Sequence, residues 1–471
     1  MVEGSETGEN KAHQVHAVRL AWVFVATIFV SGIVGALIRG LGHGPDWNSF
    51  LPETRYFWEH GQVMPGGLMF GYLPVAYFAL MPFTLVLPQP IGLYVYIAVN
   101  VLAAIGSLYV VWRWWIDGRQ IRSGLVWVVL LVALNCQHVF QLNQLTLWTL
   151  FLCVAGLALA GNGRQGLGGV LVGLAGLIKV MPMMLLGYFV FSRKWRAAGA
   201  TLATVVIFGV VPSVLVFGRQ GTIEQHRAWL ERAQWYSARA QISEPTLLGI
   251  YRHHGNFSYP AVLARWLRGQ PDQPDLIILM GTPPDEQVRQ AQRELKPNEH
   301  LVRDGLARPT HLWDKERFDM TRRPHFSLAH WPANVVWWIW AISLFIGLSA
   351  MAGWTWRISR RRPGDWASLG ALWMLVMLWA TPMMMNYYLV LALPAVAVLF
   401  QEIVRRQRWP AGRIMSAIAI VGWIFGEISL GWRAVRWYGV HFVVLGLLAA
   451  ALVVVQIRSD GRAAAEGKST G

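Results

Sequence analysis

Long apolar runs, separated by short polar or basic connections, make up most of the 471-residue chain. An α-helix needs about 20 apolar residues to cross a bilayer, and somewhat shorter runs suit short or tilted helices. The runs predict helices over 18–40, 67–87, 91–112, 124–140, 145–160, 167–178, 181–191, 199–217, 332–354, 366–380, 387–402, 414–432 and 439–457. The pattern therefore predicts an all-α polytopic integral membrane protein.

The short connections rich in Arg and Lys indicate how the runs thread through the membrane, because such loops stay on the cytoplasmic side. If 67–87 crossed the bilayer, Arg113 and Arg122 would lie outside. Pro74 and Pro82 instead favour a bent, re-entrant path for 67–87, which enters and leaves on the outer side. We therefore predict about 12 crossings, with both termini in the cytoplasm.

This threading brings five polar features to the outer face. They are the loop 41–90, the turn at Asn143-Gln144, the turn at Lys179, the loop 218–331 and the turn at 381–387. The loop 218–331 mixes acidic and basic residues, and its first part predicts an amphipathic helix over 223–241. Its stretch 269–325 is rich in Pro, Gln and Asp, and we expect it to form either a small cap or a partly disordered lid.

Composition agrees with the membrane assignment and limits the possible partners. Hydrophobic residues make up 55% of the chain and charged residues 14%, too few charges for the surface of a soluble protein of this size. The net charge of +16 comes from basic clusters in short loops, a pattern typical of topology signals and anionic-lipid contacts rather than of nucleic-acid binding. We therefore expect membrane lipids as partners, and no nucleic acid.

The sequence motifs indicate neither a cofactor site nor a metal site. The stretch 161–166 matches G-x-G-x-x-G, but apolar helices flank it and no acidic residue follows before Glu224, so we interpret it as a tight cytoplasmic turn. The chain has no Asp-x-Asp pair of the kind that holds a divalent metal on a nucleotide sugar, and its two cysteines lie in apolar runs. We expect no cofactor and no metal.

Asp46 stands just past the first apolar run and permits two interpretations. It can cap an interfacial helix over 47–60, with Trp47, Phe50, Phe57 and Trp58 among the lipid headgroups. It can also be a general base at the membrane surface, if partial burial raises its pKa. The residues alone leave both interpretations open.

Lys179 lies inside an apolar stretch, where a central Lys costs about 2.5–3.5 kcal/mol. It either snorkels from the tip of a short hairpin or faces an anion, such as a lipid phosphate at the outer leaflet. Asn143, Gln144 and Asn386 are placed at helix ends on the same side. Their amides either join helices or bind sugar hydroxyls.

The order of several short motifs resembles the GT-C glycosyltransferases that use polyprenyl-phosphate sugars, most closely family 87, which includes mannosyltransferases of phosphatidylinositol mannosides. The motifs that carry this resemblance are Asp46-Trp47, Tyr72-Leu73-Pro74-Val75, Asn143-Gln144-Leu145-Thr146, Lys179-Val180-Met181-Pro182 and Thr381-Pro382 with Tyr387-Tyr388. Tyr387 stands where the family motif has His. The likeness covers roughly residues 40–400, and within this range 269–325 looks like an insertion relative to the family.

The resemblance implies a GT-C fold and an inverting sugar transfer on the outer face of the plasma membrane. Residues 1–402 would form the catalytic module, and 403–471 a C-terminal helix pair with a cytoplasmic tail. The donor would be a polyprenyl-phosphate sugar, carrying mannose or another aldose, and the acceptor a lipid or glycan. Asp46 would be the base and Lys179 would bind the donor phosphate, while Tyr72, Asn143, Gln144, Asn386 and Tyr387 would bind donor or acceptor.

The alternative is a transporter or flippase of a lipid-linked or anionic solute, because short hairpins and an intramembrane Lys also suit such a protein. Only a transferase would consume the donor in detergent and release polyprenyl phosphate. Against a transporter, we find no inverted repeat in the sequence.

Overall fold

A computed structural model describes residues 6–41, 47–63, 72–116, 125–235, 237–243, 258–267, 328–362, 364–382, 386–404, 410–428 and 439–468. Within these ranges the secondary structure is entirely helical, which confirms the predicted all-α class. The predicted insertion 269–325 and the candidate base Asp46 lie outside the described residues.

The helices follow one another through short turns. The first half contains α1 (Glu6–Leu41), α2 (Trp47–His60), α3 (Ala76–Met81), the π-helix η2 (Pro82–Val86), α4 (Ile91–Val110), the π-helix η3 (Val111–Trp115), α5 (Leu125–Leu142), α6 (Thr146–Gly161), α7 (Gln165–Ile178), the 3₁₀-helix η4 (Met181–Met184) and α8 (Leu185–Phe191). The second half contains α9 (Trp195–Trp235), α10 (Ala238–Ser243), α11 (Tyr259–Leu267), α13 (Ala333–Arg361), α14 (Trp366–Ala380), the 3₁₀-helix η8 (Asn386–Ala392), α15 (Leu393–Val404), α16 (Pro410–Ile428) and α18 (Val440–Lys468).

Six helical stretches of the described chain are long and apolar enough to cross a membrane, which supports a multi-pass membrane protein. They are His16–Ile38, Ile91–Trp115, Trp195–Glu231, Ala333–Arg361, Tyr387–Val404 and Val440–Ile457. Further apolar helices, including α6 and α7, are shorter than 18 residues. The figure of 12 crossings therefore stays a prediction.

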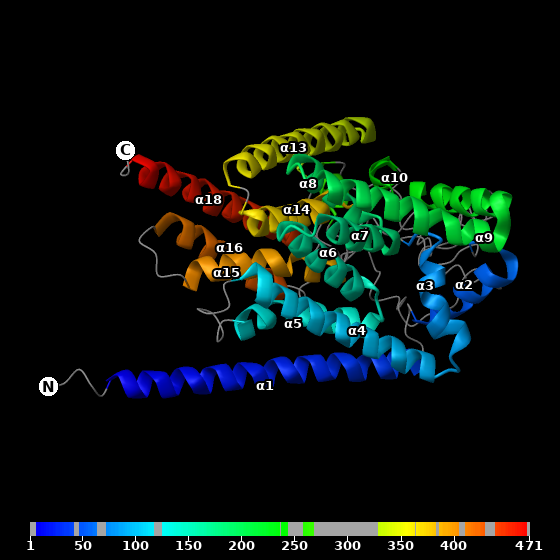
Figure 1. Cartoon of the computed structure of the whole chain (residues 1–471), viewed down its shortest axis with the longest axis horizontal. Helices are drawn as coiled ribbons and strands as arrows, with labels where there is room; N and C mark the ends of the chain where they lie inside the picture. The colour runs from blue at the N-terminus through cyan, green and yellow to red at the C-terminus, as the bar shows by residue number, and fades with distance from the viewer. Residues whose placement is uncertain are drawn as a thin grey trace.

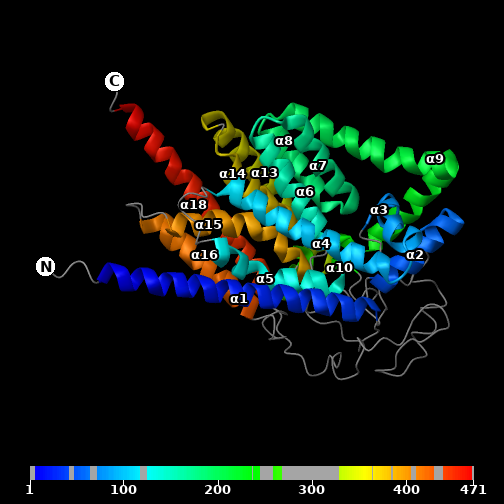
Figure 2. The same ribbon diagram turned by 60° about the horizontal axis from the view of Figure 1, so that its bottom comes forward.

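The helices lie side by side, with α1 along one edge of the molecule and α13 near the opposite edge (Figure 1). The start of α1 and the end of α18 lie at the same end in both views, whereas α2 and α3 lie at the other end (Figures 1 and 2). The threading places both termini on one side of the membrane, and that placement stays a prediction. The assignment of that side to the cytoplasm stays a prediction.

Glycines let α7 approach its neighbours closely at the centre of the molecule. A Cβ on Gly168 would lie 2.5 Å from the carbonyl oxygen of Gly156 in α6, and one on Gly173 would lie 2.9 Å from that of Thr201 in α9. Small residues at such contacts are typical of helices packed in membranes, where close van der Waals contact replaces the hydrophobic effect. The α6–α7 hairpin is therefore held tightly in the core.

The helix predicted over 199–217 and the amphipathic helix predicted over 223–241 join in one element. α9 runs from Trp195 to Trp235 and bends sharply at Gly218, whose φ of 71° and ψ of 175° are not helical. Phe217 packs there against Phe57 and Trp58 of α2, with ring centroids 5.1 and 5.8 Å apart. Figure 2 shows α9 turning back at the end of the molecule where α2 and α3 lie.

The predicted helix over 47–60 is confirmed as α2, but the predicted place of its aromatic residues is wrong. Trp47, Phe50 and Phe57 are at most 2% exposed and pack inside the protein rather than among headgroups. Trp47 contacts Tyr96, and Phe57 stacks on Tyr77 at 4.6 Å. These aromatic side chains of α2 contact protein side chains instead of lipid, because α3 and α4 pack against α2.

The segment predicted to be re-entrant contains only short helices where it is described. α3 and η2 together cover Ala76–Val86, about 16 Å at 1.5 Å per residue, which is short of the roughly 30 Å hydrocarbon core. Residues 64–71 lie outside the described chain, so the path of 67–87 stays a prediction.

The main cluster of buried hydrophobic residues has members from Ala36 to Leu452, and in it α16 packs against α15 and α18, while α18 packs against α14 and α15. The C-terminal helices therefore share the core of the rest of the chain. The predicted boundary after residue 402 falls inside α15 and stays a prediction.

Candidate functional site

Lys179 is the centre of a polar cluster buried where four helix connections meet. Its Nζ donates hydrogen bonds to Gln144 Oε1 at 3.2 Å and to Thr146 Oγ1 at 3.0 Å. The Tyr72 hydroxyl donates to the same Gln144 oxygen at 2.7 Å. Lys179 is 3% exposed, so its charge sits in a shielded place and not at a solvated hairpin tip. The snorkelling interpretation is therefore wrong.

Three tyrosine rings surround the Lys179 ammonium. Its Nζ lies 5.3, 5.1 and 4.1 Å from the ring centroids of Tyr72, Tyr387 and Tyr388. Contacts of this kind stabilise a cation by about 0.5–2 kcal/mol each, most strongly where water is excluded. Tyr387 also stacks on His138 of α5 at 6.4 Å. Aromatic faces and two hydrogen bonds thus compensate part of the cost of burying the charge.

The local sequence explains why Lys179 projects from its helix end. α7 ends at Ile178, and Lys179 takes an extended backbone with φ of −135° and ψ of 132°. Pro182 then stands in the first turn of η4, where its missing N–H costs no helical hydrogen bond. The Lys-x-x-Pro order therefore ends one helix, turns the chain and starts the next.

The turn between α5 and α6 positions Gln144 and Thr146. Asn143 has a positive φ of 55°, a conformation that Asn adopts more readily than most residues. Its Nδ2 donates to the Ala36 carbonyl oxygen at 3.3 Å, and its own carbonyl oxygen accepts from the Tyr96 hydroxyl at 2.6 Å. Asn143 therefore ties the turn to α1 and α4, while Gln144 contacts Lys179.

The predicted site residues fall into three groups. The structure brings Tyr72, Gln144, Lys179 and Tyr387 together, and it places Asn143 next to Gln144. Asn386 begins η8 beside Tyr387, but its side chain lies outside what is described, as does Asp46.

A buried carboxylate lies on the described part of α2. Glu53 is 2% exposed and accepts a hydrogen bond from the Tyr77 hydroxyl at 3.3 Å. It lies on the buried side of α2 with Phe50, whose ring meets that of Tyr72 edge-on at 5.9 Å. Glu53 is thus a buried carboxylate on the same side of α2 as Phe50, which contacts Tyr72 of the Lys179 cluster.

Sequence reasoning missed three residues of this cluster. Thr146 binds the ammonium, Tyr388 offers the nearest ring and His138 stacks on Tyr387. Thr146 and Tyr388 lie in the same motifs as the predicted site residues Gln144 and Tyr387, so the motifs could have identified them as site residues too. His138 offered only a weaker signal, a lone ring within an apolar run.

The cluster offers what a phosphate group needs: a fixed cation, phenol hydroxyls and an amide, all shielded from bulk water. Among the described residues no group of three or more His, Cys, Asp or Glu side chains could hold a metal ion. The chemistry that this arrangement supports is therefore electrostatic binding of an anion.

Comparison with known proteins supports the predicted resemblance. The sequence profile of Glycosyltransferase family 87 matches residues 70–281, a range that includes Tyr72, Gln144 and Lys179. No curated protein and no solved structure matches the chain. The match confirms the resemblance to family 87 and, with the apolar helices, indicates a membrane glycosyltransferase.

Proposed function

We propose that the protein transfers a sugar, mannose or another aldose, from a polyprenyl-phosphate donor to a lipid or glycan acceptor, with inversion at the anomeric carbon. The family match supports the sugar transfer. The observation that carries the choice of donor is the buried Lys179 ammonium, held by Gln144, Thr146 and three tyrosine rings. The helices around it are apolar enough to lie in a membrane, which suits a site for a lipid-linked donor.

Lys179 binds the phosphate of the donor in this proposal. As the bond between the anomeric carbon and the phosphate oxygen breaks, its electron pair moves to the phosphate, and negative charge grows beside the ammonium. A fixed cation stabilises that charge without reorganising, which is the usual source of electrostatic catalysis. The Tyr72 hydroxyl and the Thr146 hydroxyl supply further polar contacts to the same group.

The acceptor needs a base on the opposite face of the sugar. We assign this role to Asp46, which precedes α2 directly. Its carboxylate takes the proton of the acceptor hydroxyl while that oxygen forms the new bond to the anomeric carbon. Glu53 and Glu59, on the same helix, are the alternative bases, and only Glu53 is buried.

The proposal includes a GT-C fold, a plasma-membrane location with both termini cytoplasmic, and a site on the outer face. In this arrangement the amides of Asn143, Gln144 and Asn386 and the Tyr387 hydroxyl would bind sugar hydroxyls. The supporting observation is that Tyr72, Gln144, Lys179 and Tyr387 meet at one place, where the threading puts them on one side of the membrane.

The test is product formation by the purified protein with a panel of polyprenyl-phosphate sugars and membrane-lipid acceptors. We expect one donor to be consumed, with release of polyprenyl phosphate. Lys179→Met should raise the donor KM by about 10- to 100-fold, because one charge-assisted contact to the phosphate is lost.

Lys194→Met is the matched control, since it removes another Lys that is at least partly buried, in the turn before α9 at the opposite end of α7 from Lys179. Its donor KM should stay within about twofold of wild type. Failure of every donor in the panel to react would contradict the transferase proposal and favour the transporter. Unchanged donor kinetics in Lys179→Met would remove Lys179 from the donor site.

A further inference from the structure

An open cleft lies between the α6–α7 turn and the α8–α9 turn, at the opposite end of α7 from Lys179. Its volume is about 470 Å³, within the usual size range of small-molecule sites. α7 has 14 residues, so the cleft is about 21 Å from Lys179 along the helix axis. The cleft is therefore separate from the proposed sugar-transfer site.

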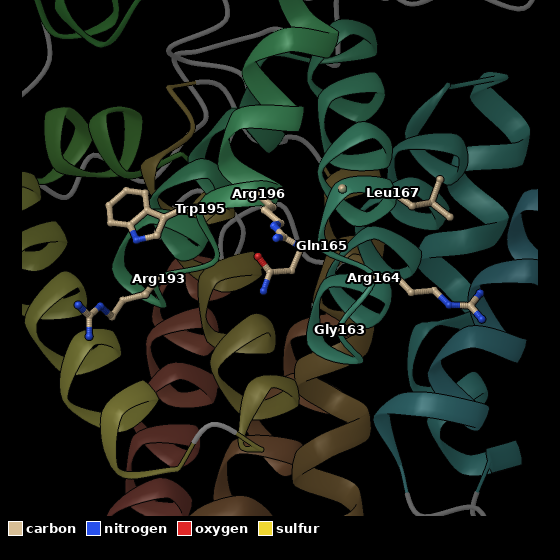
Figure 3. A pocket seen from close by; sticks show the side chains of 8 residues that line it. Gly163, Arg164, Gln165, Leu167, Arg193, Trp195 and Arg196 are labelled. Atoms are coloured by element: carbon tan, nitrogen blue, oxygen red, sulfur yellow. The ribbon is translucent and has the colours of Figure 1, made fainter.

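Three arginines line this cleft, and none of its eight lining residues is acidic. Figure 3 shows the side chains of Gln165 and Arg196 between the two turns, with Arg164 extending to one side and Arg193 to the other. All three arginines are exposed, so a ligand can reach them. Arginine forms bidentate hydrogen bonds that match the oxygens of a phosphate.

Backbone groups add to the positive potential of the cleft. α7 begins at Gln165 without a side-chain cap, and α9 begins at Trp195. The first N–H groups of a helix have no partner within that helix and carry a partial positive charge. Gly166 lines the cleft in the first turn of α7, and a Cβ there would meet nothing within 4 Å, so an anion has room to approach.

Lys194 does not contribute to the cleft in the same way. Its Nζ donates to the carbonyl oxygen of Ala160 at 3.1 Å, near the end of α6, and burial lowers the pKa of its ammonium. The charge that a ligand meets is therefore that of the arginines, with Arg196 between the two turns and Arg164 and Arg193 on either side.

Aromatic residues at the cleft point to a membrane ligand. Trp195 lines it and is 59% exposed. Arg193 lies over the ring of Trp356 in α13 at 5.0 Å, and that ring is 37% exposed. Exposed tryptophans beside arginines, at the ends of apolar helices, are typical of the headgroup region. A phosphate held here would belong to a lipid whose chains lie along the apolar helices.

We propose that this cleft binds the headgroup phosphate of an anionic phospholipid, on the side of the membrane opposite the sugar-transfer site. Basic pockets between membrane helices are suited to such headgroups. The bound lipid would hold the α6–α7 turn, which connects α6, whose first residue is Thr146, to α7, which ends directly before Lys179. The inference does not depend on the transferase reaction.

The test exploits the open space at Gly166. Gly166→Glu puts a negative charge into the cleft, whereas Gly166→Gln adds a side chain of the same shape without charge. Both should fold, and a carboxylate in the first turn of a helix is itself favourable. The purified full-length protein in detergent is titrated with phosphatidylglycerol, and bound lipid is measured by native mass spectrometry.

We expect wild type and Gly166→Gln to bind phosphatidylglycerol alike, and Gly166→Glu to bind it about tenfold more weakly, through repulsion by the added charge. Arg193→Gln with Arg196→Gln should weaken binding similarly. The control is the double variant Arg113→Gln with Arg357→Gln, which removes two exposed charges outside the cleft. It should bind phosphatidylglycerol as wild type does.

Two results would overturn the proposal. The first is equal binding of phosphatidylglycerol by Gly166→Glu and Gly166→Gln, with the Arg193 and Arg196 double variant also unchanged. The second is binding of inorganic phosphate as tight as that of phosphatidylglycerol, which would make the cleft a site for the free ion. Equal binding of zwitterionic phosphatidylcholine would exclude the preference for anionic lipids.

Discussion

The two ends of the α6–α7 hairpin both carry positive charge, but in different surroundings. At one end Lys179 is 3% exposed, held by Gln144 and Thr146 and enclosed by tyrosine rings. At the other end Arg164, Arg193 and Arg196 are exposed around an open cleft. One end holds a single fixed cation, and the other holds several solvated ones.

The degree of burial determines how charge relates to specificity in this protein. Burying an ammonium is costly unless its hydrogen bonds and neighbours are fixed, so a buried Lys is positioned for one ligand geometry. Exposed arginines stay hydrated, so their charges cost little free energy. They act through their summed electrostatic potential, which is screened by salt. Single substitutions should therefore have large, specific effects at the Lys179 end and small effects at the arginine end.

The comparison requires the two ends to lie on opposite sides of the membrane. Single cysteines at Gln89, near the Lys179 end by our threading, and at Gly166, in the arginine cleft, test this. An impermeant maleimide should label Gln89→Cys but not Gly166→Cys in intact cells, an all-or-none difference. Cys136 and Cys153 are buried, so the background should be low.

Permeabilised cells are the control for this experiment, since both cysteines should then react. Labelling of Gly166→Cys in intact cells without labelling of Gln89→Cys would reverse the assignment of the two faces. Labelling of both cysteines would place the two ends on the same side of the membrane and contradict the predicted threading.

The next largest effect is expected at the proposed base. Asp46→Asn should lower the transfer rate by about 10²–10⁴-fold, the usual cost of losing a general base. Asn caps a helix about as well as Asp, so folding should be preserved. The measurement is the transfer rate at saturating donor, beside donor binding, which should be nearly unchanged.

Glu231→Gln is the control for the loss of an acidic residue, because Glu231 is exposed on α9 and pairs only with Arg227 four residues earlier, among the contacts described. Its rate should stay within about twofold of wild type. If Asp46→Asn keeps more than about a tenth of the rate, Asp46 is a cap, and the base is Glu53 or Glu59.

Much of the fold could be predicted, because the length of each apolar run and the position of each short basic turn can be recognised from neighbouring residues in the sequence. The helix over 47–60 and the turns at Asn143 and Lys179 follow from polar, Pro or Gly residues between apolar runs. The bend of α9 could not, because Gly218 alone does not say whether a helix stops or turns back. The burial of Trp47 and Phe57 could not either, since an aromatic face suits lipid and protein alike.

In the candidate site, too, some residues could be predicted from the sequence and others could not. Lys179 and Gln144 stand out as polar residues in apolar surroundings, and each contacts the other. The roles of Thr146 and His138 depend on which helices face each other, and that is decided by packing across distant parts of the chain. Single-sequence patterns contain no such pairing.

A single hydroxyl should matter at the buried end. Thr146→Val removes one hydrogen bond to the Lys179 ammonium without changing side-chain shape, and it should raise the donor KM by about tenfold. Thr149→Val is the matched control, because Thr149 is also buried in α6 but bonds to the Leu145 carbonyl of its own turn. Donor titrations of the two variants measure the difference. Equal donor KM values would show that Thr146 does not position the cation for the donor.

The smallest effects on activity are expected at the glycines of the arginine end, where substitutions should change stability alone. A Cβ on Gly161 would lie 2.5 Å from Trp366 Cγ, so Gly161→Ala should lower the free energy of unfolding by about 1–3 kcal/mol through overpacking. Gly163 has a φ of 90° with open space around it, and its replacement by Ala should cost about 1 kcal/mol in backbone strain.

Gly166→Ala should instead be neutral or stabilising by up to about 1 kcal/mol, because Gly166 lies in the first turn of α7, where Ala is the better helix former. Thermal denaturation in detergent should therefore rank Gly166→Ala above Gly163→Ala and Gly161→Ala, with the transfer rate of the folded fraction within about twofold of wild type in all three. Such a result would show that the three glycines of this turn serve packing and chain reversal. A selective loss of transfer in Gly166→Ala, with stability kept, would mean that the arginine end takes part in catalysis, and the contrast between the two ends would fail.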